Sequence, residues 1–282
     1  MQNRQPRSVL ITGASTGIGW ACAMRLAEQG WNVFGGVRKK ADARRLAVAA
    51  PGITPLLLDV AKPAHITRAV NTLRAALGRG GLQALVNNAG IAVSGPLEFL
   101  PIAELRRQMD VNFTGQVVLT QACLPLLRAG RGRVVNISSI GGRIVAPLLT
   151  PYSASKFALE AFTDGLRREL APWGLPVVSV QAGSIATPIW EKSLDTAQRM
   201  RRRLPRRAES LYGPMMRRGA RRARASAARG LPAEEAAVLL ERILTERRPR
   251  PRYVIGKGTG LALLAARLLP DTWLDWIIRR EF

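Results

Sequence analysis

The sequence predicts an α/β fold, a doubly wound parallel sheet with helices on both faces in three layers. Short apolar runs of strand length alternate with longer helical patterns along 282 residues. Strands that are apolar throughout are typical of a parallel sheet covered on both faces. Because no repeat or linker divides the chain, we expect one domain over residues 1–282, a size that can bury a large core.

The expected elements follow one another in strict alternation. The first apolar run ends at Gly13, and the helix after it ends before Gly30, a residue typical of helix ends. Strands are expected at residues 8–12, 31–37, 54–60, 84–88, 133–137 and 177–181, with a seventh at 253–255. Helices are expected at residues 20–29, 41–50, 64–77, 102–128 and 152–172.

Composition excludes several classes of protein. No apolar run reaches the roughly 18 to 20 residues that span a bilayer, and residues 1–7 lack the apolar core of a signal peptide. Cys22 and Cys123 lie in apolar helical patterns and are expected as separate core residues, which fits a reducing, cytoplasmic compartment. With His65 as the only histidine and no cysteine cluster, neither a metal site nor a Ser-His-Asp triad is expected.

Nearly half of the net charge of +24 is concentrated in one stretch. Residues 199–229 contain twelve arginines and a single acidic residue, Glu209. A solvated Arg-rich insertion is the favoured interpretation, and binding to a polyanion or an anionic membrane is the alternative. Nucleic acid is therefore not the favoured partner.

Tyr152 and Lys156 form the motif around which the chemistry is organised. They are four residues apart in a helical pattern, so they lie on one helix face. A phenol titrates near about 10, and an adjacent ammonium group should lower its pKa toward the range useful for acid–base catalysis. An isolated pair of this kind is more often an exposed surface pair.

A glycine-rich turn, Gly13-Ala14-Ser15-Thr16-Gly17-Ile18-Gly19, follows the first strand. Glycines let the backbone approach a pyrophosphate, and the following helix offers free N–H groups at its N-terminus. Glycine also serves tight turns for conformational reasons. Alone, the turn is weak evidence for a dinucleotide site.

The spacing TGxxxGIG of this turn resembles that of the short-chain dehydrogenase/reductase family. Further matches follow in order: Asn87-Asn88-Ala89-Gly90 after the fourth strand, Asn112 on the next helix, Ser139 thirteen residues before Tyr152, and Thr187 after the sixth strand. The resemblance covers about residues 8–190, and residues 152–193 are most similar to the branch with hydroxysteroid and retinol dehydrogenases.

The resemblance implies a Rossmann-type fold and a role for each matched residue. Tyr152 exchanges a proton with the substrate oxygen, Lys156 lowers the phenol pKa and holds the nicotinamide ribose, and Ser139 polarises the substrate oxygen. Asn112 holds a water that links Lys156 to solvent. Taken alone, Ser139 and Asn112 would be turn or capping residues. The expected cofactor-binding set is Gly13, Ser15, Thr16, Gly17, Ile18, Gly19, Arg38, Asp59, Val60, Asn88, Ala89, Gly90, Tyr152, Lys156, Ile185 and Thr187.

The end of the second strand favours NADP(H) over NAD(H). An acidic residue there would bind the adenosine ribose and repel a 2′-phosphate, but the chain has Val37 followed by Arg38-Lys39-Lys40. The planar guanidinium of Arg38 matches phosphate oxygens. An exposed basic turn without a ligand is the alternative interpretation.

Two segments lie beyond the matched motifs. Residues 191–230 are expected to be an Arg-rich substrate loop, whose arginines either face an anionic substrate or lie outside an apolar pocket. The residues that would line such a pocket are Leu194, Met200, Leu204, Leu211, Tyr212, Met215 and Met216. The apolar segment 260–282 is expected first as a lid or packing segment, second as a subunit contact, and third as an interfacial membrane helix.

The sequence thus predicts an NADP(H)-dependent oxidoreductase that interconverts an alcohol and a carbonyl on a lipophilic substrate of steroid, retinoid or fatty type. One alternative is a ketoreductase for an anionic acyl thioester. Another is a non-catalytic, NADP-sensing protein that binds a polyanion through residues 199–229. The family's habit of pairing its two long helices implies a homodimer or homotetramer, cytoplasmic, with peripheral membrane contact as a further option.

Overall fold

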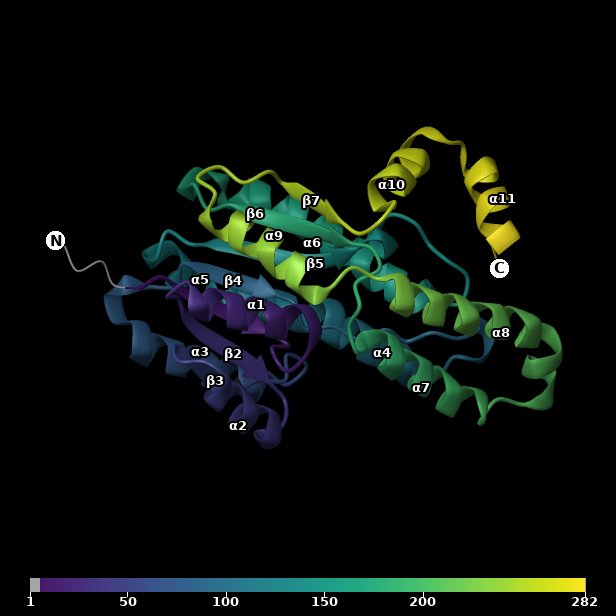
Figure 1. Ribbon diagram of the computed structural model, residues 1–282, viewed down its shortest axis with the longest axis horizontal. Coiled ribbons are helices and arrows are strands. Elements are labelled where there is room, and N and C mark those ends of the chain that lie inside the picture. The colour runs from purple at the N-terminus through teal and green to yellow at the C-terminus, as the bar shows by residue number, and fades with distance from the viewer. Residues whose placement is uncertain (1–5, 282) are drawn as a thin grey trace.

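The computed structural model describes residues 6–281 and is built on one parallel sheet of seven strands (Figure 1). The strand order is β3-β2-β1-β4-β5-β6-β7, and every neighbouring pair is parallel. The strands are β1 Ser8–Thr12, β2 Asn32–Val37, β3 Ile53–Leu57, β4 Ala84–Asn87, β5 Arg133–Ser139, β6 Val177–Ala182 and β7 Arg252–Ile255. The carboxyl ends of all these strands therefore lie at one edge, and the predicted doubly wound sheet is confirmed.

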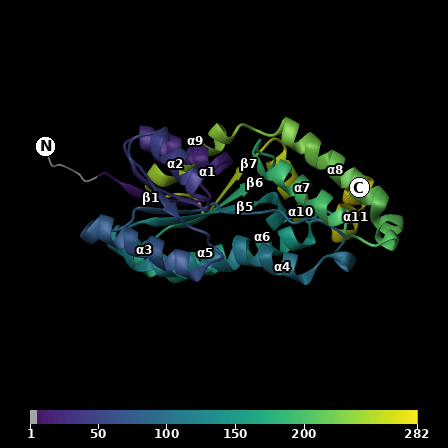
Figure 2. The ribbon, with the colours of Figure 1, turned by 90° about the horizontal axis from the view of Figure 1, so that it is seen from below.

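Helices cover both faces of the sheet. Figure 2 shows α1, α2 and α9 on one face and α3, α5 and α6 on the other. The helices are α1 Gly17–Glu28, α2 Lys40–Ala49, α3 Pro63–Leu77, α4 Ile102–Met109, α5 Gly115–Ala129, α6 Thr150–Leu170, α7 Ile189–Arg201, α8 Arg206–Arg229, α9 Ala233–Thr245, α10 Thr259–Leu268 and α11 Asp271–Glu281. The fold is thus a three-layer α/β/α arrangement.

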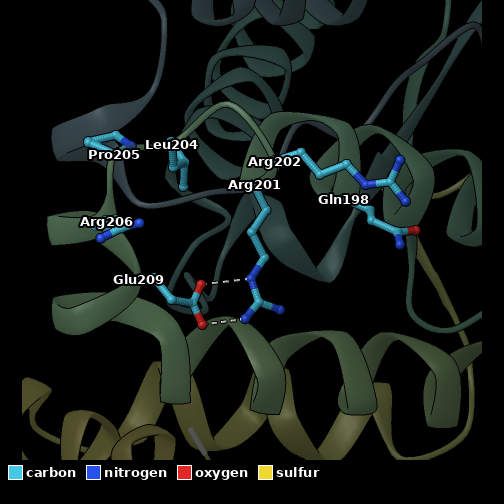
Figure 3. Close-up of a pocket in the computed structure, with 7 residues that line it drawn as sticks. All are labelled: Gln198, Arg201, Arg202, Leu204, Pro205, Arg206 and Glu209. Atoms are coloured by element: carbon cyan, nitrogen blue, oxygen red, sulfur yellow. Dashed lines mark hydrogen bonds and ion pairs between the residues drawn. The ribbon is translucent and has the colours of Figure 1, made fainter.

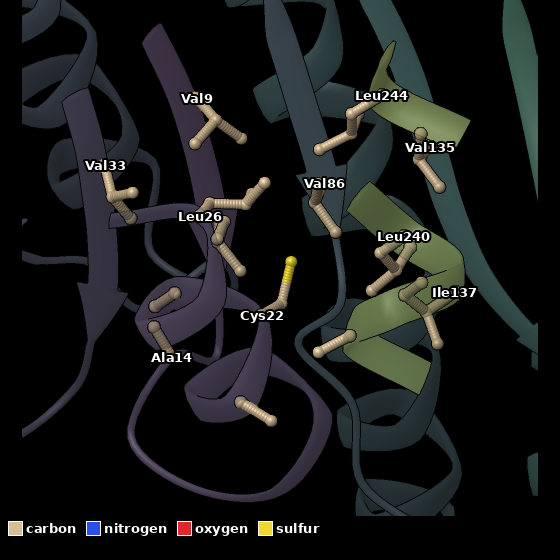
Figure 4. Packing of buried hydrophobic residues seen from close by; sticks show 14 of the residues in the cluster. Val9, Ala14, Cys22, Leu26, Val33, Val86, Val135, Ile137, Leu240 and Leu244 are labelled. Atoms are coloured by element: carbon tan, nitrogen blue, oxygen red, sulfur yellow. The ribbon is translucent and has the colours of Figure 1, made fainter. Parts of the chain in front are cut away.

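Alternate strand residues supply two separate cores. Val9 and Ile11 face α1 and α9, whereas Leu10 between them faces α3 and α5. Figure 4 shows the first core, where Cys22 of α1 packs among strand residues and Leu240 of α9. Each fully buried aliphatic side chain contributes about 1.5 to 3 kcal/mol to folding.

The two cysteines are core residues, as predicted, and they lie in opposite cores. Cys22 and Cys123 are free and fully buried. Burial raises the pKa of each thiol to about 12. Both sulfurs are therefore inert packing groups near neutral pH.

The predicted helix at residues 102–128 is interrupted by a π-helical turn, Asp110–Thr114. Gly115 directly follows this turn and packs closely against the loop after β3. An added Cβ at Gly115 would lie 2.3 Å from the carbonyl oxygen of Val60. The wider turn accommodates this contact without breaking the helix, and π turns are often found at functional sites. The turn carries Asn112.

Four helices lie beyond the carboxyl edge of the sheet, at one end of the molecule. Figures 1 and 2 both place α7, α8, α10 and α11 at this end. Within residues 6–281, no helix has the length and apolar character needed to cross a membrane.

The segment expected as a lid or packing element is only loosely covered. Leu261 of α10 is 74% exposed and Trp273 of α11 is 65% exposed. The expectation that these side chains pack on the rest of the chain is therefore wrong.

Candidate active site

Lys156 is buried one helical turn after Tyr152 on α6. Its ammonium group is 6.0 Å from the centre of the Tyr152 ring and donates a hydrogen bond of 2.8 Å to the carbonyl oxygen of Ile137 on β5. Burial lowers the pKa of Lys156 to about 8, and the carboxylate of Glu160 opposes this change. The pair is therefore not an exposed surface pair.

The phenol of Tyr152 is hydrogen-bonded to the side chain of Ser139. Burial raises the pKa of this phenol above its ordinary value, and the bond to Ser139 partly opposes the rise. The pKa of the phenol is thus raised overall and not lowered as expected from the sequence, because desolvation of the phenolate outweighs the opposing effects.

Ser139 ends β5 and makes two kinds of contact. Its Oγ accepts a hydrogen bond of 3.0 Å from the N–H of Gly141, which caps the short 3₁₀ helix Ile140–Gly142. The same side chain bonds to Tyr152. The capping interpretation is thus correct, and it fixes the hydroxyl beside the phenol.

Asn112 is fully buried in the π-helical turn. Its Oδ1 accepts from the N–H of Ile91 at 2.9 Å, and its Nδ2 donates to the carbonyl of Ile91 at 3.0 Å and to Ser155 Oγ at 3.1 Å. A Cβ added to Gly90 would lie 3.6 Å from Asn112 Oδ1 and 3.9 Å from Lys156 Nζ. Gly90 therefore lies between the side chains of Asn112 and Lys156.

The glycine-rich turn leaves backbone donors free at the carboxyl edge. Gly13 and Gly17 have φ values of 67° and 59°, which favour glycine. Thr16 stands at the N-cap of α1 without a side-chain hydrogen bond to the helix, and no acidic residue lies in the first turn. The first N–H groups of α1, which begins at residues 17–19, can thus bind an anion such as a pyrophosphate.

Residues after β4 and β6 close around this turn. Thr12 Oγ1 accepts hydrogen bonds of 2.9 Å from the N–H groups of both Asn88 and Ala89. A Cβ added to Gly17 would lie 2.9 Å from the methyl group of Thr187. Ser15 lies in the same turn, Ile18 and Gly19 lie in the first turn of α1, and Ile185 lies in the loop after β6.

Three predicted cofactor-binding residues follow the neighbouring strands β2 and β3. Arg38 follows β2 and its side chain is exposed. Asp59 and Val60 follow β3, where Asp59 Oδ1 accepts from the N–H of Ala61 at 3.2 Å and Val60 is buried. These positions are at the carboxyl edge, as an adenosine-binding role requires.

A buried carboxylate was missed by the sequence prediction. Glu160 is 3% exposed and accepts hydrogen bonds from Ser179, from Gln181 at 3.0 Å and from Arg252 at 3.0 Å. Its position four residues after Lys156 in an otherwise apolar run was the available signal. It is the anion that compensates the buried ammonium.

Gly141 is a second missed residue. An added Cβ there would lie 3.0 Å from Cε1 of Tyr152 and 3.4 Å from Ser139 Oγ. The missing side chain therefore leaves room for the phenol ring. The two consecutive glycines at positions 141 and 142, one residue after Ser139, were the available signal in the sequence.

Helix α7 crosses the carboxyl edge and contacts the motif loops. Ser193 Oγ donates to the carbonyl of Ala92 at 3.0 Å, and Lys192 Nζ lies 3.5 Å from Thr16 Oγ1. On α8, Tyr212 donates to Glu98 at 3.0 Å and packs edge-on against Phe99. These contacts fix α7 and α8 over residues 91–99.

The arginines of α8 lie outside, with Arg206, Arg207, Arg217, Arg218, Arg221, Arg222, Arg224 and Arg229 all exposed. The apolar set expected to line a pocket is half-buried between the helices, except Leu211, which is 55% exposed and does not belong to it.

A depression of about 400 Å³ lies between α7 and α8 (Figure 3). It is lined by Gln198, Arg201, Arg202, Leu204, Pro205, Arg206 and Glu209. Arg201 binds Glu209 through two hydrogen bonds, one of 2.8 Å. No predicted catalytic residue lines this depression, so it is separate from the Tyr152 site.

Comparison with known proteins places the chain in a family. A family model described as short chain dehydrogenase matches residues 7–198. The NADPH-dependent 3-dehydrocapnine reductase of Ornithobacterium rhinotracheale is 36% identical over 98% of this chain and 97% of that protein. Retinol dehydrogenase 5 of Mus musculus is 36% identical over 96% of this chain and 89% of that protein.

A solved structure agrees with these matches. A short-chain dehydrogenase from Streptomyces avermitilis superposes with a TM-score of 0.77 at 26% identity, covering 99% of this chain and 97% of that one. The chain therefore belongs to the short-chain dehydrogenase/reductase family, in its retinol and hydroxysteroid dehydrogenase branch, and is an NAD(P)-dependent oxidoreductase acting on alcohol and carbonyl groups.

Proposed function

We propose that the protein is an NADP(H)-dependent reductase in which Tyr152 protonates the oxygen of a lipophilic ketone or aldehyde. The observation that carries this proposal is geometric: the buried ammonium of Lys156 lies 6.0 Å from the centre of the Tyr152 ring, and a Cβ added to Gly141 would lie 3.0 Å from Tyr152 Cε1 and 3.4 Å from Ser139 Oγ. A phenol, a hydroxyl and a cation are the groups that proton transfer to a developing alkoxide needs.

Each of these residues has a distinct part in the proposed reaction. The bound nicotinamide supplies or accepts hydride. Tyr152 donates its proton to the substrate oxygen and becomes a phenolate. Because the pKa of Tyr152 is raised, this phenolate readily takes up a proton again. Lys156 stabilises that phenolate electrostatically, while Ser139 donates a hydrogen bond to the same oxygen. Asn112 is a positioning residue that joins the backbone of Ile91 to Ser155 of α6.

The preference for NADP(H) rests on the end of β2. Arg38 is exposed there and no carboxylate follows Val37. A guanidinium binds a 2′-phosphate through paired hydrogen bonds, whereas the ribose hydroxyls of NAD need an acceptor. The relative from O. rhinotracheale is NADPH-dependent by name, which agrees with this preference.

A lipophilic substrate is favoured by the side chains near α7 and α8. Leu194, Met200 and Tyr212 are half-buried there, while the arginines of α8 face outward. Retinol dehydrogenase 5, by its name, acts on a lipophilic alcohol. An anionic acyl thioester is the second candidate, because Arg202 and Arg206, at the junction of α7 and α8, are exposed to solvent. A non-catalytic protein that binds a polyanion is a further alternative, and its only support is the exposed arginines of α8.

We also expect a cytoplasmic homodimer or homotetramer formed through α5 and α6. Val118 of α5 is 36% exposed and Phe157 of α6 is 41% exposed. Apolar side chains on both helices fit a self-complementary contact between subunits. Light scattering on the wild type and on Phe157→Arg tests this arrangement, since the variant should be monomeric.

A substrate panel tests the proposed function. Oxidation of NADPH is followed with apolar ketones, apolar aldehydes and acyl thioesters, each also with NADH. We expect turnover with apolar carbonyls and NADPH. Turnover with acyl thioesters alone would show that the substrate is an acyl thioester and not an apolar carbonyl. No turnover with any carbonyl would contradict the proposal.

A further inference from the structure

Helices α10 and α11 expose a series of large apolar side chains. On α10, Leu261, Leu264 and Leu268 are 74%, 52% and 69% exposed. On α11, Trp273, Trp276 and Ile277 are 65%, 55% and 38% exposed. The three leucines of α10 are three, four and seven residues apart, and Trp276 and Ile277 lie three and four residues after Trp273, so each set lies on one side of its helix. Contiguous exposed apolar faces mark interaction sites.

Cations accompany these apolar faces. Arg267, Arg279 and Arg280 are exposed on the same two helices, and the guanidinium of Arg280 lies 3.7 Å from the centre of the Trp276 ring. Figures 1 and 2 both place the Arg-rich helix α8 at the same end of the molecule as α11. A surface of tryptophan, leucine and arginine matches the boundary between lipid headgroups and acyl chains.

We propose that α10 and α11 form a docking surface, residues 259–280, that binds the surface of an anionic lipid bilayer. The helices lie in the plane of the headgroups and do not cross the bilayer, since no helix in the described part of the chain is long and apolar enough to span it. The exposed arginines of α8 add attraction to anionic headgroups.

Charge decides between a lipid surface and a second copy of the chain as the occupant. The chain carries a net charge of +24, and the Arg-rich helix α8 lies at the same end of the molecule as the docking surface. A two-fold contact would place the same cationic end of one subunit against that of another, which is unfavourable. An anionic bilayer supplies the opposite charge and an apolar layer together.

The docking surface also lies at the end of the molecule where the strands end. Tyr152 and Ser139 are at this carboxyl edge, and α7 and α8 extend from it (Figure 1). A substrate dissolved in the bilayer would therefore enter on the membrane side. The binding itself does not depend on the proposed reaction and is tested without turnover.

The test is co-sedimentation with vesicles, either of phosphatidylcholine alone or of phosphatidylcholine and phosphatidylglycerol in equal parts. The variant is the double substitution Trp273→Glu and Trp276→Glu. Trp173→Glu is the matched control, because Trp173 is 58% exposed and lies over Arg128, but precedes β6 at the opposite edge of the sheet. Thermal unfolding checks that each variant is folded, and Leu261→Glu with Leu264→Glu provides a second variant on α10.

We expect the wild type and the Trp173 control to bind the phosphatidylglycerol vesicles, less strongly at high salt. The α11 and α10 variants should lose binding by about tenfold or more, since a charged group replaces each inserted apolar one. Absence of wild-type binding, or equal binding by all proteins, overturns the proposal. The proposal is also overturned if the wild type is an oligomer in solution and the α11 variant is a monomer, because a second copy of the chain would then cover the docking surface.

Discussion

The ammonium group of Lys156 donates a 2.8 Å hydrogen bond to the carbonyl oxygen of Ile137, the residue two positions before Ser139 on β5. This bond ties the helix that carries the phenol to the strand that carries the hydroxyl. Because Lys156 is only 4% exposed, its charge depends on the few polar groups around it. The pH dependence of activity should report this directly.

Activity should fall as the pH rises through about 8. Burial lowers the pKa of Lys156 to about 8, so the ammonium is present below that pH and is lost above it. A profile of kcat/KM against pH for the free enzyme measures this limit. Lys156→Arg should be less active but keep its activity constant across pH 8, because arginine stays protonated. A wild-type profile without a fall between pH 7 and 9 contradicts the assignment.

Glu160→Gln should move this upper limit to lower pH. The carboxylate raises the pKa of Lys156, so its removal lowers that pKa further. Arg143 and Arg252 also contact Glu160 and remain in the variant. Asp164→Asn is the control, because Asp164 binds the same Arg252 at 2.6 Å but lies two turns from Lys156.

The two variants are compared by pH profile and by thermal unfolding. Both lose a carboxylate partner of Arg252, so both should unfold at a lower temperature than the wild type. Only Glu160→Gln should shift the pH limit. Equal shifts in both variants would show that the effect is structural.

Gly141→Ala should slow the reaction while leaving stability nearly unchanged. The new methyl group would lie 3.0 Å from Tyr152 Cε1, so the ring must move by a few tenths of an ångström. We expect kcat/KM to fall by roughly tenfold, since small displacements of reacting groups are costly. Gly165→Ala on α6 is the control, because no atom lies within 4 Å of its added Cβ. A variant at Gly141 with wild-type kcat/KM would remove that residue from the site.

Arg38→Asp should reverse the cofactor preference. The carboxylate would repel a 2′-phosphate and accept a ribose hydroxyl, so the ratio of kcat/KM for NADPH to that for NADH should fall by about tenfold or more. Lys39→Asp makes the same change of charge at the adjacent exposed position and should have a smaller effect. An unchanged ratio in Arg38→Asp would leave the basic turn without a role in cofactor choice.

Much of the fold was predictable because parallel strands have a simple pattern. Runs such as residues 8–12 and 177–182 are buried throughout, and a helix follows almost every strand. The π-helical turn at Asp110–Thr114 was not predictable, because it accommodates a tertiary contact between Gly115 and Val60. Nothing in the local sequence distinguishes it from an ordinary helix.

The site was predictable where residue type and spacing carry it. Ser139, Tyr152 and Lys156 are brought together as expected. The raised pKa of Tyr152 and the role of Glu160 were not predictable, because both depend on burial. A glutamate on a helix ordinarily faces water, and only the packing of β6 and β7 against α6 shows otherwise.

The most direct test of the account is the activity of Tyr152→Phe with NADPH and the best apolar carbonyl of the panel. The substitution removes one hydroxyl and keeps the ring that packs against Gly141. General acid catalysis predicts a fall in kcat of about 10² to 10⁴-fold, with NADPH affinity and thermal stability close to those of the wild type. A kcat within a few-fold of the wild type would contradict the role of Tyr152 as the proton donor.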